Sequence, residues 1–243
     1  MAGKIRLDVA LVQQGAFPSR EKARRAIMAG WVSSGERRLD KPGMLVDAEG
    51  SLEVKGGEKF VGRGGLKLEG ALAGFGLRVQ DRVALDIGAS TGGFTDCLLQ
   101  AGAVRVHAVD VGRGQLDWRL RNDPRVIVKE GLNARHITPA DIGEAVDICV
   151  ADVSFISLTL ILPAVFVLLA PDADMITLIK PQFELTPNKV GRGGVVRDSR
   201  YHEEAVERIR AFVASAGARW QGVIPSPITG REGNVEFLAH IKL

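Results

Sequence analysis

From residue 67 onward, apolar runs of strand length alternate with stretches of helical periodicity. The predicted strands cover residues 83–87, 104–109, 126–128, 147–152, 175–179 and 235–241. The predicted helices cover residues 67–75, 94–101, 114–120, 158–169 and 201–216. This alternation predicts an α/β fold with a doubly wound, mostly parallel sheet. Such sheets bind their ligands at the carboxyl ends of the strands.

The N-terminal part of the chain follows a different pattern, which is typical of a small α+β unit. One helical period runs from Leu7 to Gly15, and Ser19 is a good N-cap for a second helix that ends at Gly30. Short strands are expected at residues 31–32, 44–46 and 52–54. Glycine and turn residues then separate the two patterns. We therefore expect a domain at residues 1–60, a linker at 61–66 and a second domain at 67–243.

The composition is that of an ordinary globular protein, with 46% hydrophobic and 25% charged residues. The longest mostly apolar run, residues 155–170, contains Ser157, Thr159 and Pro163 and is shorter than the roughly 20 residues that span a bilayer. The start of the chain does not resemble a signal peptide. Cys97 and Cys149 fit neither a disulfide framework nor a metal site. The sequence therefore favours a soluble, cytoplasmic protein without a metal.

The net charge of +3 is located at the N-terminus. Residues 1–62 contain 11 Lys and Arg against 8 Asp and Glu, whereas the rest of the chain contains 21 of each. The cations of this segment gather on the second predicted helix and on the loop after it, at Arg20, Lys22, Arg24, Arg25, Arg37, Arg38 and Lys41. Cations clustered on a rigid helix match RNA phosphates. A merely solubilising helix is the alternative that charge alone leaves open.

A glycine-rich turn, GASTGG at residues 88–93, follows the first strand of the second domain. The spacing of Gly88 and Gly93 is that of a phosphate loop, but Phe94 stands where the phosphate-binding lysine belongs. Ser90 replaces the second glycine of a dinucleotide turn, and its Cβ would obstruct a pyrophosphate. The turn therefore suits a cofactor that has an adenosine but no phosphate.

Polar residues at the ends of the following strands point to the same cofactor. Asp110 can accept both ribose hydroxyls of an adenosine, Asn133 could contact an adenine edge, and Asp152 can offset a positive charge. Two simpler alternatives remain open, namely that Asp86 caps the turn and that Asn133 is only a turn residue. We expect S-adenosylmethionine as cofactor. Its predicted binding residues are Asp86, Gly88, Ser90, Gly92, Gly93, Phe94, Asp110, Asn133 and Asp152.

Six stretches of the second domain carry a resemblance to a known family. They are RGGLKL (63–68), DIGASTGGFTD (86–96), ADVSFISL (151–158), IKPQFE (179–184), GRGGVVRD (191–198) and GNVEF (233–237). With them the chain resembles, over nearly its whole length, the TlyA family within the FtsJ-like ribose 2′-O-methyltransferases. The N-terminal segment resembles the S-four-type RNA-binding module through Arg6-Leu7-Asp8, Ser19-Arg20-x-x-Ala23 and Ile27-x-x-Gly30-x-Val32.

The resemblance implies a Rossmann-like class I methyltransferase fold and a Lys–Asp–Lys–Glu tetrad. The tetrad falls on Lys67, Asp152, Lys180 and Glu236. The resemblance also implies S-adenosylmethionine as methyl donor and ribosomal RNA, at a cytidine-type site, as substrate. The family has historically carried a haemolysin label. A membrane-active protein is therefore one alternative, and an RNA-binding protein with an inactive methyltransferase fold is another.

The residue types suit transfer to a ribose oxygen, because a 2′-hydroxyl must lose its proton as the methyl group arrives. Lys180 ends an apolar strand, and we expect it to accept that proton. Lys67 and Glu236 would orient the hydroxyl and the lysine, with Asp152 bridging Lys180 and the sulfonium side. The segment from Asp152 to Phe155 lacks the prolines found in enzymes that methylate exocyclic base nitrogens, so oxygen is the favoured acceptor.

The acceptor side of the site is expected to include residues 181–184 and the glycine-rich segment 191–198. Phe155 or Phe183 could stack on a nucleotide turned out of the RNA, although ordinary core packing is an equal alternative for both. The predicted RNA contacts are Arg6, Arg20, Lys22, Arg24, Arg25, Arg37, Arg38, Arg63, Arg192 and Arg197.

Overall fold

The computed structural model describes residues 3–57, 59–230 and 232–243. The chain divides into two compact units, Met1–Lys59 and Phe60–Leu243, each with a core of its own. Residues 64–66, which were expected in the linker, instead form the start of helix α3 (Gly64–Phe75). Gly65 permits this because a Cβ there would lie 2.2 Å from the buried ring of Phe60.

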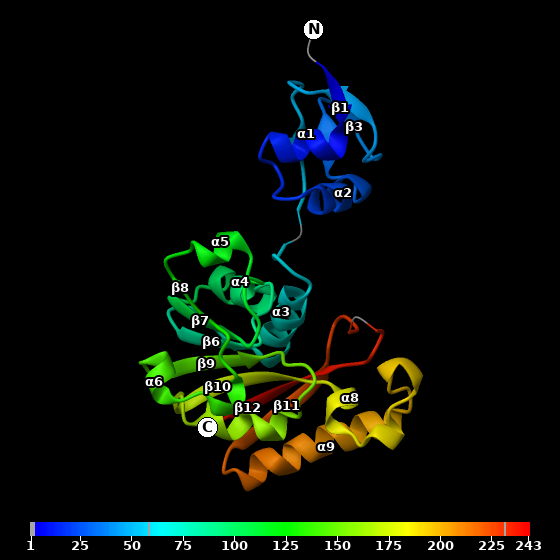
Figure 1. The fold of residues 1–243 in the computed structure, drawn as a ribbon. Helices are drawn as coiled ribbons and strands as arrows, with labels where there is room; N and C mark the ends of the chain where they lie inside the picture. Colours follow the sequence, from blue (N-terminus) through cyan, green and yellow to red (C-terminus); the bar gives the residue numbers. More distant parts are fainter. Residues whose placement is uncertain (1–2, 58, 231) are drawn as a thin grey trace. The chain divides into compact units, whose positions relative to one another are not determined.

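The second unit is built on a seven-stranded sheet with the order β11-β12-β10-β9-β6-β7-β8 (Figure 1). Its strands are β6 (Val83–Ile87), β7 (Arg105–Asp110), β8 (Val126–Glu130), β9 (Val146–Ala151), β10 (Leu169–Ile179), β11 (Arg219–Pro225) and β12 (Phe237–Lys242). Strands β8, β7, β6, β9 and β10 are parallel to one another, and β12 is antiparallel to both β10 and β11. The predicted, mostly parallel sheet is confirmed.

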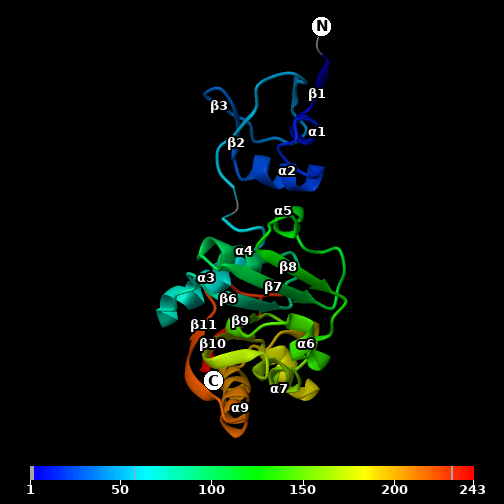
Figure 2. The ribbon, with the colours of Figure 1, turned by 90° about the vertical axis from the view of Figure 1, so that its left-hand side faces the viewer.

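Helices cover both faces of this sheet, as the two views in Figures 1 and 2 show. The helices are α3, α4 (Gly93–Gln100), α5 (Trp118–Arg121), α6 (Pro139–Ile142), α7 (Leu162–Phe166), α8 (Pro181–Glu184) and α9 (Ser199–Ser215). Successive residues of the central strands belong to opposite cores. Ile148 packs with α3 and α4, whereas Cys149 packs with α7 and α9. The doubly wound architecture follows from strands that are apolar on both faces.

Two parts of this unit differ from the sequence prediction. Strand β11 was not predicted, because it lies at the sheet edge and its residues alternate between exposed and half-buried without an apolar run. The predicted helix 158–169 is instead a 3₁₀ turn (Leu158–Leu160), the short helix α7 and the first residue of β10. Buried helices and buried strands are both apolar, so periodicity does not separate them.

The N-terminal unit packs two helices, α1 (Leu7–Gln13) and α2 (Arg20–Met28), against short strands. Strand β1 (Lys4–Arg6) pairs with β4 (Leu45–Asp47), and β2 (Val32–Ser34) lies between β3 (Arg37–Arg38) and β5 (Glu53–Val54). Arg37 and Arg38, expected on a loop, therefore belong to a strand. Ser19 caps α2 as predicted, since its side chain accepts a hydrogen bond from the Lys22 amide.

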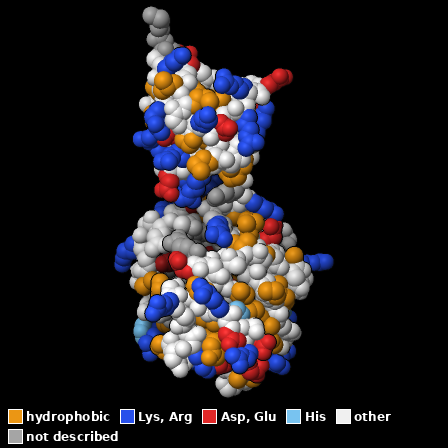
Figure 3. Space-filling view, turned by 90° about the vertical axis from the view of Figure 1, so that its right-hand side faces the viewer, with side chains coloured by type: hydrophobic (Ala, Val, Ile, Leu, Met, Phe, Trp, Pro, Cys, Tyr) orange, Lys and Arg blue, Asp and Glu red, His pale blue; other side chains and the backbone are white. Residues whose placement is uncertain are grey.

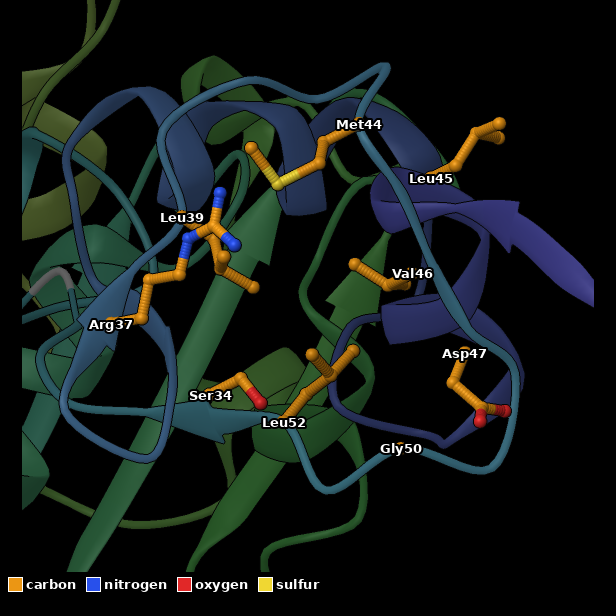
Figure 4. Close-up of a pocket in the computed structure, with 9 residues that line it drawn as sticks. All are labelled: Ser34, Arg37, Leu39, Met44, Leu45, Val46, Asp47, Gly50 and Leu52. Carbon is orange, nitrogen blue, oxygen red and sulfur yellow. The ribbon is translucent and has the colours of Figure 1, made fainter.

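A pocket of about 220 Å³ opens between the two small sheets of this unit (Figure 4). Met44, Val46 and Leu52 turn toward its centre, and Arg37 lies at its edge. Its lining is mainly apolar and continuous with the core of the unit. Throughout the described ranges, none of the helices combines the length and the apolar character needed to cross a membrane.

Candidate active site

The glycine-rich turn connects β6 to α4 at the carboxyl end of the sheet. Gly88 and Gly92 have φ angles of +83° and +96°, a region that favours glycine. A Cβ at Gly88 would lie 2.4 Å from the carbonyl oxygen of Asp152, and one at Gly92 would lie 2.2 Å from the Leu120 side chain. The two glycines therefore allow the turn to run directly against the end of β9 and against α5.

Asp110, at the end of β7, closes this turn. One carboxylate oxygen accepts the Ser90 amide at 2.7 Å, and the other accepts the Gly112 amide at 2.7 Å. Ser90 itself has a positive φ of +49°, so its amide points back toward the carboxylate. Each carboxylate oxygen has two lone pairs, and one on each remains for a ligand hydroxyl.

Asp86, near the end of β6, lies fully buried beneath the turn. The Thr95 hydroxyl donates to its Oδ2 at 2.6 Å, whereas Oδ1 has no hydrogen-bond partner among the described residues. Burial, and the nearby charges of Asp152 and Asp110, raise the pKa of Asp86 to about 7. A buried oxygen without a partner and a group of neighbouring carboxylates favour a positively charged ligand at this end of the sheet.

Two of the predicted cofactor residues have side chains that contact other parts of the protein. Phe94 is buried in the core, and its ring lies against Gly64 at the start of α3, so its side chain does not face the turn. Asn133 caps a 3₁₀ turn, Ala134–His136, by accepting the Arg135 amide at 3.0 Å. Its amide oxygen therefore makes the hydrogen bond that is expected of a turn residue, which is the alternative that the sequence left open for Asn133.

The four tetrad residues come from four different segments of the chain and lie at the carboxyl end of the parallel strands. The antiparallel pairing of β10 and β12 ends with Ile179 opposite Phe237, and Lys180 and Glu236 are the next residues on these two strands. Lys67, on α3, donates to Glu236 at 2.5 Å. Lys180 lies 2.6 Å from the carboxylate of Asp152, which follows β9. The topology therefore brings together two amines and two carboxylates.

Both ion pairs are largely withdrawn from water. The side chains of Lys67 and Lys180 are each 10% exposed, and that of Glu236 is 4% exposed. Lys180 also donates to the Ser154 hydroxyl at 2.9 Å. Besides its bond to carbon, the nitrogen has three bonding directions, so these two contacts leave one direction for a further hydrogen-bond partner. This geometry can hold a hydroxyl beside the Lys180 nitrogen.

Two residues here make contacts that sequence reasoning did not predict, although Glu184 was expected on the acceptor side of the site. Ser154 contacts Lys180, and Glu184, buried at the end of α8, accepts the Ser157 hydroxyl at 2.6 Å and the Leu158 amide at 2.9 Å. Glu184 therefore ties the segment after β9 to the helix that follows Lys180. Both residues lie in the stretches ADVSFISL and IKPQFE, but no spacing rule indicated a role for them.

Phe155 and Phe183 form an aromatic pair beside Lys180. Their ring centroids are 5.2 Å apart, and the Lys180 nitrogen is 5.9 Å from the centre of the Phe183 ring. Phe155 is 91% exposed and has a φ of +64°, an unusual conformation for a bulky residue. Ordinary core packing therefore does not explain Phe155, and exposed strain of this kind concentrates at functional sites.

All ten cations predicted to contact RNA are exposed. Figure 3 shows one face of the molecule, and Lys and Arg side chains are frequent on the N-terminal unit in its upper part. Arg63 donates to the Thr229 carbonyl at 3.4 Å, and Arg25 pairs with Glu21 at 2.6 Å.

Comparison with known proteins agrees with this architecture. Residues 60–243 match the FtsJ-like methyltransferase family, and residues 5–51 match the S4 domain. The chain is 45% identical over 244 residues to the 16S/23S rRNA (cytidine-2′-O)-methyltransferase TlyA of Mycobacterium tuberculosis, covering 100% of this chain and 91% of the relative. It is 42% identical to Hemolysin A of Brachyspira hyodysenteriae, covering 97% of this chain and 99% of that protein.

Solved structures show the same fold. A structure from Streptococcus thermophilus with the word hemolysin in its title is 47% identical, covers 100% of this chain and 89% of its own, and superposes with a TM-score of 0.76. An S-adenosylmethionine dependent methyltransferase from Mesorhizobium loti, 15% identical with a TM-score of 0.54, covers 71% of this chain and 96% of its own and shares the fold. The chain therefore belongs to the FtsJ-like methyltransferases, within them to the TlyA proteins, and carries an S4 domain at its N-terminus.

Proposed function

We propose that this protein transfers a methyl group from S-adenosylmethionine to the 2′-hydroxyl of a cytidine in ribosomal RNA. The observation that carries the proposal is the convergence of the four tetrad residues at the carboxyl end of the parallel strands, where the glycine-rich turn also lies. These residues are Lys67, Asp152, Lys180 and Glu236. The names of the TlyA relatives support the choice of ribosomal RNA and of a ribose oxygen. We place the reaction in the cytoplasm.

The residues present fit the proposed cofactor. The turn has two glycines at positions where a Cβ would collide with the neighbouring backbone or side chains. The buried Asp86 has an oxygen that finds no partner in the described part of the chain. Asp110 would accept the ribose hydroxyls, and the carboxylates of Asp86 and Asp152 would favour the positive charges. When bound, S-adenosylmethionine supplies an activated methyl group on a sulfonium.

Lys180 is the residue that we assign to the proton of the 2′-hydroxyl. Its nitrogen contacts Asp152 and Ser154, so the lone pair of the amine points in one fixed direction. As a neutral amine, it takes the proton that the ribose oxygen loses, and the resulting ammonium is stabilised by Asp152. Lys67, fixed by Glu236, donates a hydrogen bond that orients the same hydroxyl. Placement of this kind contributes much of the acceleration in a displacement reaction.

The acceptor nucleotide requires a surface next to Lys180. Phe155 and Phe183 offer two adjacent aromatic rings there, and base–aromatic stacking contributes about 1–3 kcal/mol per base. The exposed arginines of residues 191–198 and of the S4 domain would bind phosphates of the same RNA.

The test is methyl transfer to ribosomal subunits from a strain that lacks this activity. Purified protein and methyl-labelled S-adenosylmethionine should place the label on the 2′-oxygen of one or a few cytidines, and Lys180→Ala should place none. Label on a base, or no label on either subunit, would overturn the proposal. Lysis of red cells by the purified protein, measured in parallel, would instead favour the membrane-active alternative, and we expect none.

A further inference from the structure

An acidic residue lies buried beneath the basic surface of the N-terminal unit. Asp8, in the first turn of α1, has no exposed surface, although it carries a carboxylate. Arg6 donates to its two oxygens at 3.0 and 3.2 Å, and Arg20, at the start of α2, donates two further hydrogen bonds at 2.9 and 3.3 Å. One carboxylate therefore receives four N–H groups from two guanidiniums that belong to different elements.

The two arginines keep most of their binding capacity. A guanidinium has five N–H groups, so each arginine has three left after its contacts with Asp8. The side chains of Arg6 and Arg20 are 48% and 57% exposed, which leaves these groups accessible to a ligand. The three side chains together carry a net charge of +1. Hydrogen bonds from Arg6, followed by those from Arg20, hold the pKa of Asp8 at about 2, so Asp8 stays ionised.

The local backbone supports the same geometry. The Arg6 guanidinium lies beside Gly43, where a Cβ would be 3.3 Å from its Nη1. Arg20 is the first residue of α2, which Ser19 caps. Both long side chains are thus held before any ligand arrives. Ordering a free side chain upon binding costs free energy, and side chains that are already held avoid this cost.

We propose that Asp8 is a positioning residue that joins Arg6 and Arg20 into one preformed fork for a backbone phosphate of the RNA substrate. This proposal rests on the proposed function, because it takes RNA as the ligand. Without the carboxylate, the two guanidiniums repel each other and separate. The fork is therefore lost even though both positive charges remain.

The variant Asp8→Asn tests this proposal, because the charge change and the loss of the fork predict opposite changes in affinity for RNA. Asp8→Asn makes the RNA-binding unit more positive by one charge, so charge alone predicts tighter binding to the ribosomal subunit that the wild-type protein methylates. Loss of the fork predicts binding about tenfold weaker. It also predicts a smaller dependence of the binding constant on salt, since fewer phosphates are engaged. The value of kcat at saturating subunit should stay unchanged while KM rises.

Glu49→Gln is the matched control, because Glu49 is an exposed acid of the same unit and the charge change is the same. It should leave binding unchanged or make it slightly tighter. An Asp8→Asn protein that binds as tightly as Glu49→Gln would overturn the proposal. If the wild-type protein methylates no subunit, it is the proposed function that fails.

Arg20→Lys keeps the proposal testable if Asp8→Asn does not fold. This variant retains the charge but lacks the planar guanidinium, so the fork of the two arginines cannot form. We expect a similar tenfold loss of affinity. Where both variants fold, adding Asp8→Asn to Arg20→Lys should weaken binding little further, because both changes remove the same fork. Unchanged affinity of Arg20→Lys would contradict the inference.

Discussion

Lys67 and Glu236 are 169 positions apart in the chain, yet their charged groups meet at 2.5 Å in a buried ion pair. Lys67 is held by α3, and Glu236 by the start of β12. The pair therefore joins a helix on one face of the sheet to the antiparallel strand beside β10. It fixes one side of the proposed active site as well as part of the fold.

Removing one partner should destabilise the protein more than removing both. Glu236→Gln leaves a buried ammonium without its carboxylate, and we expect the free energy of unfolding to fall by about 3–5 kcal/mol. The double variant Lys67→Met/Glu236→Gln should recover most of that loss. Urea denaturation measures both. The more exposed pair of Lys189 and Glu204 is the control, and Glu204→Gln should cost less than about 1 kcal/mol. A Glu236→Gln protein as stable as wild type would contradict the role of this pair.

Lys180→Ala should abolish methyl transfer and leave binding of S-adenosylmethionine nearly unchanged. The assigned role is proton transfer from the substrate, which typically contributes about 10²–10⁴-fold to the rate. Single-turnover methylation of the ribosomal subunit and calorimetric titration of the cofactor separate the two effects. Lys189→Ala, at a half-buried lysine that also pairs with a carboxylate, should retain full activity. Near-normal turnover of Lys180→Ala would remove the assignment.

Phe155→Asn should reduce kcat/KM for the ribosomal subunit about tenfold or more, because the ring proposed to stack on the acceptor base is gone. Stability should stay the same or rise by up to about 1 kcal/mol, since asparagine tolerates the positive φ better than phenylalanine does. Phe155→Trp keeps an aromatic surface and should keep most of the activity. Equal activity of the Asn and wild-type proteins would show that the ring is not used.

Glu184→Gln should lower kcat about tenfold with little change in KM for RNA. The glutamine amide has one acceptor oxygen, so it cannot accept the Ser157 hydroxyl and the Leu158 amide on two separate oxygens as Glu184 does. We expect the segment that carries Asp152 and Ser154 to shift. Steady-state kinetics and thermal unfolding check the variant together. Glu203→Gln, an exposed glutamate of α9, is the control and should behave as wild type. An unchanged kcat would show that this contact does not position the site.

The buried Asp86 should make stability depend on pH. Its pKa is raised to about 7 in the folded protein from 3.8, so folding favours the protonated form. The contribution to stability is complete below about pH 4 and is lost as the pH rises through about 7. Between pH 5 and pH 8 this corresponds to about 3 kcal/mol. Denaturation curves at both pH values should show this loss in the wild-type protein and not in Asp86→Asn. Equal losses in the two proteins would exclude Asp86 as the cause.

The secondary structure of short segments was predictable from the sequence. Strand β6, the glycine-rich turn and the start of α4 follow from an apolar run, a cluster of glycines and a helical period. Ser19 as the cap of α2 follows from the preference of serine for that position. These features depend on residues close together in the chain, so a local pattern is enough to specify them. The resemblance that named the tetrad rested on short motifs of the same kind.

Only the tertiary structure decided which of these local features meet. The register of β12 against β10 places Lys180 next to Glu236, and the packing of α3 supplies Lys67 as the partner of that glutamate. Packing also buried the Phe94 side chain and left Phe155 exposed. Register and packing are set by contacts between residues far apart in sequence, whose energies depend on the whole sheet. A periodic pattern along one segment contains no information about them.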